Sequence, residues 1–362
     1  MKNLLYLFMV LMLFGLLVGC GGDGGTNGGN GDDEYIQANL VASLTAAAPS
    51  MTNIDDPVWA TIDSTPVRVG FDDAYGVNPN LVDDTLMMWA IRTNDMIYLR
   101  ARWKDFTADL KGTHIRKSGF VGGWEYINTA DAGGGEDAFF IVFDGLDNDS
   151  DTIPERADCA TMCHAAQNMM ATTGGGHVDA WAWKSATSNP AYLSIDQWWS
   201  ATGNFNDPDP LNPRQPYIDN WNSSLVIPRW MHTDDTAYTG LYLYIDDTVR
   251  YQYVGYGWDE KIGYIMPGHI IDTTVYKDAI PQSRWNVRTI ASYDSTSAPY
   301  GWTAVFARLL NTSYSDDVNL TGLDSIQVTV AVTNHHTDIT DDTWREHSGS
   351  YPFYIVFNRS TQ

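Results

Sequence analysis

Short segments in which apolar and polar residues alternate recur along the chain after residue 55. In residues 96–103 every second side chain is apolar, and these side chains belong to Ile97, Leu99, Ala101 and Trp103. Such alternation is typical of a β-strand with one buried face. Similar segments occur at residues 138–143, 240–245, 302–307, 326–332 and 353–357. The pattern predicts a β-rich protein.

The stretches between these segments are rich in Gly, Pro, Asn and Asp, which favour turns and long loops. Helical periodicity is scarce apart from residues 158–170. No repeat of fixed period is apparent, and no linker rich in Pro and Ser interrupts residues 35–362. We therefore expect an all-β fold, in which residues 35–362 form a single β-sandwich domain with long loops and one short helical segment.

The N-terminus has the pattern of a lipoprotein leader. Residues 1–3 precede an apolar run over residues 4–18, which is short for a spanning helix but has the length of a secretion signal. The run ends in Leu-Val-Gly-Cys20, which resembles a bacterial lipobox with Cys20 as the acylated residue. We expect residues 1–19 to be a signal peptide and the Gly-rich residues 20–34 to be a flexible tether. An anchor helix with an incidental Cys is the alternative.

Composition narrows the classes of partner. The chain of 362 residues has 45 acidic and 21 basic side chains, which gives a formal net charge of −24. This charge repels phosphate backbones and anionic lipid headgroups, so nucleic-acid binding is excluded as a leading function and membrane contact is expected through the lipid anchor alone. With only three Cys residues, the fold does not depend on a disulfide scaffold.

The other two Cys residues lie in the segment Cys159-Ala-Thr-Met-Cys163-His164. Covalent attachment of haem needs two thiols that add to the vinyl groups of one porphyrin and an imidazole that reaches the iron. The usual motif has two residues between the thiols, and here there are three, but the step from Cys163 to His164 is kept. The segment predicts one covalent haem c with His164 as the proximal iron ligand. A disulfide between the two Cys residues, or a zinc site that includes His177, stays open as an alternative.

Residues 177–190, downstream of this motif, read His-Val-Asp-Ala-Trp-Ala-Trp-Lys-Ser-Ala-Thr-Ser-Asn-Pro. They resemble the haem-binding family typified by the gamma subunit of ethylbenzene dehydrogenase, whose members carry a Val-Asp/Asn-x-Trp-x-Trp-Lys segment. Shorter matches occur at residues 54–59, 97–105, 196–199, 302–310, 330–336 and 351–357, so the resemblance extends over roughly residues 50–357. It implies a β-sandwich like that of family 9 carbohydrate-binding modules and DOMON domains, with a haem held at one end.

The resemblance also implies which residues contact the haem. In members with haem b, a Met and a Lys ligate the iron, and Lys184 matches that Lys. Trp181 and Trp183 are expected to line the haem site and to keep water from the amine, which must be neutral to bind iron. This chain departs from the haem b pattern by supplying a proximal His. The candidates for the distal ligand are Lys184, Met169, Met170 and His177.

An acidic segment precedes the Cys pair. Residues 144–151 contain four Asp and one Asn. Carboxylates at every second position, as at Asp147, Asp149 and Asp151, can converge on a hard cation such as Ca2+. The Gly and Glu of a calcium loop are absent in the proper register. The segment therefore fits either a calcium site or a solvated acidic loop.

Two functional hypotheses follow. The first is an exported, lipid-anchored monohaem c-type cytochrome that transfers electrons, whose redox partners by resemblance are a molybdenum-containing enzyme or other cytochromes. No Asp follows Cys20, which by resemblance directs a lipoprotein of the cell envelope to the outer membrane, facing the periplasm or the cell exterior. The second is a surface carbohydrate-binding lipoprotein, with some of its 14 Trp and 20 Tyr stacking on sugars. No motif of a hydrolase or a nucleotide-dependent enzyme is present, so an electron carrier is favoured over an enzyme.

Overall fold

The computed structural model describes residues 38–71, 84–105, 107–118, 123–127, 135–144, 177–200, 203–207, 216–233, 242–251, 265–272, 283–334, 346–350 and 352–358. The expected leader and tether, the Cys pair with its helical segment, and the three carboxylates of the acidic segment lie outside these residues. Among the described residues, no helix combines the length and apolar character needed to cross a membrane.

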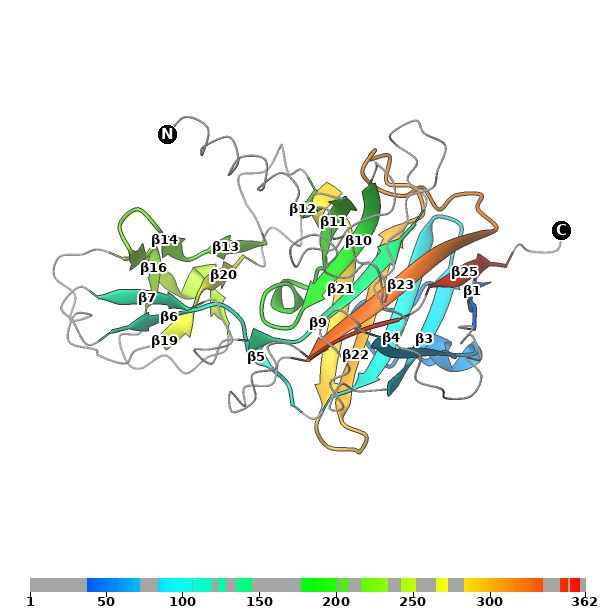
Figure 1. Ribbon diagram of the computed structural model, residues 1–362, viewed down its shortest axis with the longest axis horizontal. Helices are drawn as coiled ribbons and strands as arrows, with labels where there is room; N and C mark the ends of the chain where they lie inside the picture. Colours follow the sequence, from blue (N-terminus) through cyan, green and yellow to red (C-terminus); the bar gives the residue numbers. More distant parts are fainter. Residues whose placement is uncertain are drawn as a thin grey trace, which may run out of the picture. The chain divides into compact units, whose positions relative to one another are not determined.

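Most strands belong to one large sheet, which has 13 strands among the described residues (Figure 1). Its order is β12 (Gly203–Asn206), β11 (Ile195–Ser200), β10 (His177–Lys184), β9 (Ala138–Phe143), β23 (Ser325–Asn334), β24 (Glu346–Ser350), β2 (Thr65–Phe71), β3 (Asp84–Arg92), β4 (Met96–Lys104), β22 (Gly301–Leu309) and β21 (Arg288–Asp294). Two strands lie off this path, β1 (Leu40–Leu44) and β25 (Phe353–Phe357). β1 pairs in parallel with both β3 and β25, whereas the other pairs of this sheet are antiparallel.

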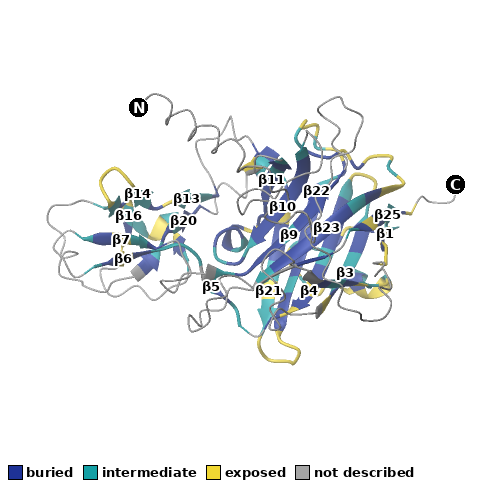
Figure 2. Ribbon diagram, in the orientation of Figure 1, coloured by how far each residue is buried: buried dark blue, intermediate teal, exposed yellow. Residues whose placement is uncertain are grey.

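The two halves of this sheet face each other across an aromatic core. The Trp103 ring of β4 stacks on Phe139 of β9 with ring centroids 5.0 Å apart, and Phe139 stacks on Phe306 of β22 at 5.5 Å. Stacked aromatic pairs of this kind contribute about 0.5–1.5 kcal/mol beyond the area that they bury. Figure 2 shows that the strands β9, β10 and β23, which carry much of this core, are largely buried. The all-β sandwich predicted from the sequence is confirmed.

Alternate side chains of β4 belong to two hydrophobic clusters, one on each face of the strand. The four apolar residues predicted to share a face lie in the main core, whereas Tyr98 belongs to a second cluster on the outer face. That cluster lies around the 3-10 helix η1 (Pro57–Thr61), where Trp59 is buried. The helix begins with Pro57 and is capped by Asp56, whose carboxylate accepts the Val58 N–H at 2.9 Å.

Smaller sheets are formed by chain segments that lie, in the sequence, between strands of the large sheet. They comprise β13 (Tyr217–Asp219), β20 (His269–Ile271) and β17 (Leu243–Tyr244); β19 (Ile265–Pro267), β6 (His114–Lys117) and β7 (Trp124–Ile127); β14 (Trp221–Asn222) and β15 (Ile227–Pro228); β16 (Trp230–His232) and β18 (Thr248–Arg250); and β5 (Leu110–Lys111) and β8 (Gly135–Glu136). Further 3-10 helices are η4 (Asn189–Ala191), η5 (Ile245–Asp247) and η7 (Ser283–Trp285). Ile271 of β20 and Trp285 of η7 share a buried cluster with Ala182 of β10, so these elements cover the outer face of that strand.

The predicted strands match the observed ones closely, with one exception. Residues 138–143 and 353–357 coincide with β9 and β25, and residues 302–307 and 326–332 lie within β22 and β23. In residues 240–245 the strand β17 is only two residues long, and the chain then turns into η5. Asp246 and Asp247 follow in the first turn of η5, and Asp disfavours continued strand pairing.

Candidate functional site

β10 carries the Val-Asp-Ala-Trp-Ala-Trp-Lys segment and divides it between two faces. Because side chains alternate along a strand, Trp181 and Trp183 point to one face and Lys184 to the other. Both Trp side chains are fully buried in the main core, whereas the Lys184 side chain is 37% exposed. The structure therefore does not bring the two Trp rings and the Lys184 amine onto one face.

Core contacts hold both Trp rings. Trp183 meets Trp103 and Trp302 edge-on, with ring centroids 5.7 and 5.0 Å apart. Trp181 lies under the guanidinium of Arg308, whose Cζ is 4.9 Å from the ring centroid. In the described part of the chain the two rings thus have a place in the sandwich core. A sequence pattern alone does not separate such core positions from contact with a cofactor.

The Lys184 amine is weakly held. Its Nζ lies 3.7 Å from Glu136 Oε1, which is longer than a hydrogen bond. Glu136 also accepts the Ala186 N–H at 3.2 Å, the Thr187 N–H at 3.0 Å and the Thr187 hydroxyl at 2.8 Å. Glu136 therefore keeps three donors when Lys184 turns away, and a partly exposed ion pair contributes about 1 kcal/mol or less. The amine can change its partner at little cost.

Neutral aromatic side chains lie near this ion pair. Burial lowers the pKa of His269, with Glu136 opposing that shift and Lys184 adding to it. The Tyr217 ring meets the His269 ring edge-on, with centroids 5.5 Å apart, and burial raises the pKa of Tyr217. Both rings are therefore uncharged near pH 7. The surroundings of Lys184 combine one charged pair with neutral rings.

The other candidate ligand on β10 lies at the opposite end of the strand. His177 is the first residue of β10 and Lys184 the last, so at about 3.3 Å per residue they are about 23 Å apart, on opposite faces. The His177 ring is tilted against Trp198, with centroids 5.1 Å apart. Burial lowers the pKa of His177, although Asp316 and Asp179 oppose the shift, so the imidazole is neutral at pH 7. His177 and Lys184 cannot both ligate one metal atom.

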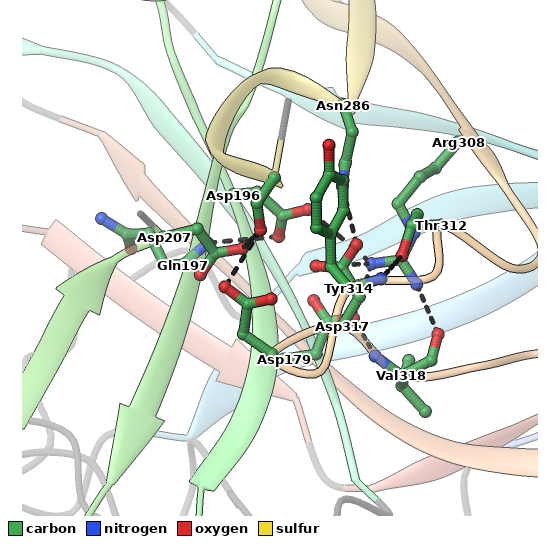
Figure 3. A network of polar contacts seen from close by, with 12 residues as sticks. Asp179, Asp196, Gln197, Asp207, Asn286, Arg308, Thr312, Tyr314, Asp317 and Val318 are labelled. Atoms are coloured by element: carbon green, nitrogen blue, oxygen red, sulfur yellow. Dashed lines mark hydrogen bonds and ion pairs between the residues drawn. The ribbon is translucent and has the colours of Figure 1, made fainter. Parts of the chain in front are cut away.

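A buried ion cluster lies on the core face of β10 (Figure 3). Arg308 of β22 is fully buried, and its Nη1 donates to Asp179 Oδ2 of β10 at 2.6 Å. The same Nη1 lies 3.7 Å from Asp196 Oδ2 of β11 and 3.9 Å from Asp317 Oδ1 in the loop after β22. Arg308 Nη2 donates to the Val318 carbonyl at 2.9 Å. One guanidinium thus joins two strands and a loop to β22.

Asp207, directly after β12, adds a fourth buried carboxylate. Its Oδ2 accepts the Ser283 hydroxyl at 3.1 Å. One carboxylate oxygen from each of Asp196, Asp207 and Asp317 lies within 4.8 Å of the others. We refer to Asp179, Asp196, Asp207, Arg308 and Asp317 as the ion cluster.

The carboxyl groups of the ion cluster are costly to ionise together. Burial raises the pKa of Asp207 to about 8 and, against the effect of Arg308, that of Asp317 to about 6. Burial also raises the pKa of Asp196 well above its ordinary value. Burial alone would lower the pKa of the Arg308 guanidinium. The negative charges of Asp179, Asp196 and Asp317 together have the larger effect, and they raise that pKa above its ordinary value. Arg308 therefore stays charged, and part of the acids hold protons at neutral pH when no further cation is present.

A sequence model of ethylbenzene dehydrogenase matches residues 56–346, which is most of the chain and includes β10, β22 and the ion cluster. The chain belongs to the ethylbenzene dehydrogenase family. The family resemblance predicted from the sequence is thereby confirmed, and the family is associated with haem binding.

Other comparisons add little to this membership of the ethylbenzene dehydrogenase family. No curated protein matches the chain significantly. A solved structure of a presumed carbohydrate-binding protein from Bacteroides uniformis is similar with a TM-score of 0.38 and 8% identity, over 89% of this chain and 100% of that one. A likeness at this level carries no argument about function.

Three segments of the ethylbenzene dehydrogenase pattern meet at the ion cluster. Asp179 belongs to the Val-Asp-x-Trp-x-Trp-Lys segment, Asp196 to the match at residues 196–199 and Arg308 to the match at residues 302–310. The segments are recognisable in the sequence, but the sequence alone did not identify Arg308 or its partners Asp196, Asp207 and Asp317 as site residues. A signal for Arg308 was present, because it continues the inward series of Trp302, Ala304 and Phe306. A lone Arg at such a position needs buried acids around it.

The remaining predicted site residues of this ethylbenzene dehydrogenase family member lie outside the described residues, and they stay predictions. They are Cys20, Asp147, Asp149, Asp151, Cys159, Cys163, His164, Met169 and Met170.

Proposed function

We propose that this member of the ethylbenzene dehydrogenase family is an exported, lipid-anchored monohaem c-type cytochrome that carries single electrons between redox proteins. The observation that carries the proposal is the Cys159-Ala-Thr-Met-Cys163-His164 segment, which lies inside the region matched by a family associated with haem. In this proposal Cys159 and Cys163 form the thioether bonds, and His164 is the proximal ligand. Haem, when bound, supplies the redox chemistry through its iron.

The surroundings of Lys184 fit the distal role that the family pattern implies. Lys184 is the last residue of β10, which pairs with β9 and β11 in the large sheet, so the backbone of Lys184 is held in place. Its amine is partly exposed, and its ion pair with Glu136 is long. Release of that pair leaves no buried acceptor unsatisfied, because Glu136 keeps its three other donors. We therefore take Lys184 as the distal ligand, ahead of His177, Met169 and Met170.

Replacing Lys184 with Ala is expected to convert low-spin iron to high-spin iron in the oxidised full-length protein, as seen in absorption and electron paramagnetic resonance spectra. Lys104→Ala is the matched control, because Lys104 is an exposed Lys at the end of β4, and it should leave the spectra unchanged. A change with His177→Ala but not with Lys184→Ala places the distal ligand at the other end of β10 and refutes the assignment to Lys184.

Covalent haem is tested directly on a denaturing gel. Protein made together with haem-maturation machinery is expected to show a haem-stained band, because thioether bonds survive denaturation. The variant with both Cys159→Ala and Cys163→Ala should lose the stain completely. Cys20→Ser is the control, since it should keep the stain and release the protein from the membrane fraction. An unstained band for the unaltered chain would rule out haem c.

The charge of the chain indicates the kind of redox partner. A net charge of −24 repels acidic proteins and favours docking to a basic face, with an association rate that falls as salt is added. We propose that the redox partner is a molybdenum-containing enzyme or another cytochrome. We also propose that the protein is a lipoprotein of the outer membrane in the cell envelope.

The alternative of carbohydrate binding has less support in the described residues. There, every Trp side chain is buried or half-buried, so none offers an open ring on which a sugar could stack. The exposed aromatic side chains come from different strands and loops, and they are Tyr192, Phe205, Tyr244, Tyr300, Tyr314 and Tyr354.

A further inference from the structure

Four carboxylate oxygens of the ion cluster have no hydrogen-bond partner among the described residues. They are Asp179 Oδ1, Asp196 Oδ2, Asp207 Oδ1 and Asp317 Oδ1, and all four are buried. Asp196 Oδ2 and Asp317 Oδ1 lie within 4 Å of Arg308 Nη1, but the distances of 3.7 and 3.9 Å are too long for hydrogen bonds. Buried acceptors are rarely left unsatisfied in folded proteins. The four oxygens therefore indicate a bound group that is not one of the described side chains.

The oxygens have the spacing of ligands around a single ion. Those of Asp196, Asp207 and Asp317 lie within 4.8 Å of one another. Calcium binds oxygen at 2.3–2.6 Å, so two ligands of one ion are at most about 5 Å apart. Figure 3 shows the carboxylates of Asp179, Asp196 and Asp207 pointing toward one another from neighbouring strands. Each of these Asp side chains is at least nine-tenths buried.

The charges of the ion cluster do not balance. Three carboxylates lie within 4 Å of one guanidinium and a fourth, that of Asp207, lies beside two of them, so the fully ionised cluster has a charge of −4 + 1 = −3. A divalent cation among the carboxylates reduces this to −1, without any change in the hydrogen bond between Arg308 and Asp179. Buried charges are tolerated only when they are paired or bound to a metal.

We propose that Asp196, Asp207 and Asp317 bind one calcium ion, with the amide oxygen of Asn286 as a further ligand. Asn286 Nδ2 donates to Asp317 Oδ2 at 2.7 Å, and its Oδ1 is buried without a hydrogen-bond partner in the described structure. A set made only of oxygens selects a hard cation over zinc or copper. Four protein oxygens suit calcium better than magnesium, which keeps several waters in a strict octahedron.

One ligand of the site comes from a partly exposed loop. Asp317 lies in the loop between β22 and β23, where most residues from 311 to 315 are exposed. The bound ion joins β11, the end of β12 and this loop. It uses other residues than the acidic segment at Asp147, Asp149 and Asp151, which the sequence alone suggested as a calcium site.

Equilibrium dialysis of the full-length protein, stripped with a chelator and then exposed to radioactive calcium, tests the proposal. Asp207→Asn keeps the size of the side chain and removes one charge, and it is expected to lose one bound calcium per chain or to weaken it at least tenfold. Asp149→Asn in the acidic segment is the matched control and should retain that calcium. Equal binding by the unaltered protein and Asp207→Asn overturns the proposal, as does an absence of calcium binding at millimolar concentration.

Thermal unfolding provides a second measurement on the same proteins. Calcium is expected to raise the unfolding temperature of the unaltered chain, because it binds the folded state, but not that of Asp207→Asn or Asp196→Asn. A cooperative unfolding transition in chelator shows that each variant is folded. An equal rise in the unaltered chain and in both variants means that the stabilising calcium lies elsewhere, and the assignment to the ion cluster is then wrong.

Discussion

Replacing Arg308 with Met is expected to lower the free energy of unfolding by about 3–5 kcal/mol, the usual effect of removing one partner from a buried ion pair. The guanidinium is fully buried and lies within 4 Å of three buried Asp side chains, with its shortest contact, 2.6 Å, to Asp179. Met fills much of the same volume, so the loss is electrostatic and not a cavity effect. Urea unfolding in chelator measures it without a contribution from divalent cations.

The effect of Arg308→Met is expected to depend on pH. Because burial raises the pKa of Asp207 to about 8 and that of Asp317 to about 6, protonation of these groups stabilises the fold at low pH and this contribution is lost as pH rises through those values. Arg308 lowers the pKa of Asp317 and Asp196, so both pKa values rise further in Arg308→Met, and the repulsion among the carboxylates in this variant is largest at high pH and shrinks as the pH falls. Arg102→Met, on the exposed face of β4, is the control and should change stability by no more than about 0.5 kcal/mol.

Two outcomes would contradict this account of the ion cluster. A loss below about 1 kcal/mol at pH 8 would mean that the carboxylates are neutral there without Arg308. A loss that is the same at pH 5 and pH 8 would mean that packing, not charge, is responsible. Combining Arg308→Met with Asp179→Asn should recover part of the stability, since the two changes remove both partners of the shortest pair.

The second large effect is expected at Trp183. Trp183→Ala should lower the free energy of unfolding by about 3–5 kcal/mol, because a fully buried ring that touches Trp103 and Trp302 is replaced by a cavity. Lys184→Ala, one residue later, should cost about 1 kcal/mol or less, because it removes only a long, partly exposed ion pair. Chemical denaturation of the two variants side by side measures the difference.

This pair of variants separates the two roles within the Trp-x-Trp-Lys segment. Trp183→Ala is expected to change stability far more than Lys184→Ala, whereas Lys184→Ala alone is expected to change the spin state of the iron. A spectral change in both variants at equal haem content would show that the Trp183 ring also acts on the cofactor. Similar losses of stability in both variants would mean that Lys184 is part of the core.

The fold could be predicted from the sequence because its strands carry their own pattern. In β4 the alternation of apolar and polar side chains assigned the residues to the inner and outer faces, and β9 and β25 begin and end at the predicted residues. The same pattern was ambiguous in β10. Both faces of that strand are buried, so Ala182 and Trp183 are equally hidden although they point to opposite sides.

The ion cluster could not be assembled from the sequence because its members are far apart along the chain. Asp179 and Asp196 become neighbours only through the antiparallel pairing of β10 with β11, and Arg308 reaches them only when the two halves of the sheet pack face to face. With 45 acidic residues in the chain, no single Asp stands out before that packing is known. The inward position of Arg308 was the one local sign.

The position of β1 has a consequence for the order of folding during synthesis. β1 at Leu40–Leu44 pairs with β25 at Phe353–Phe357, so one of its edges has no neighbour until the ribosome has translated the last strand that the structure describes. The pairing closes a loop of about 300 residues, which makes it a slow, late event. The sandwich is therefore completed only after β25 has been synthesised, and until then β1 presents an open edge to chaperones and to other chains.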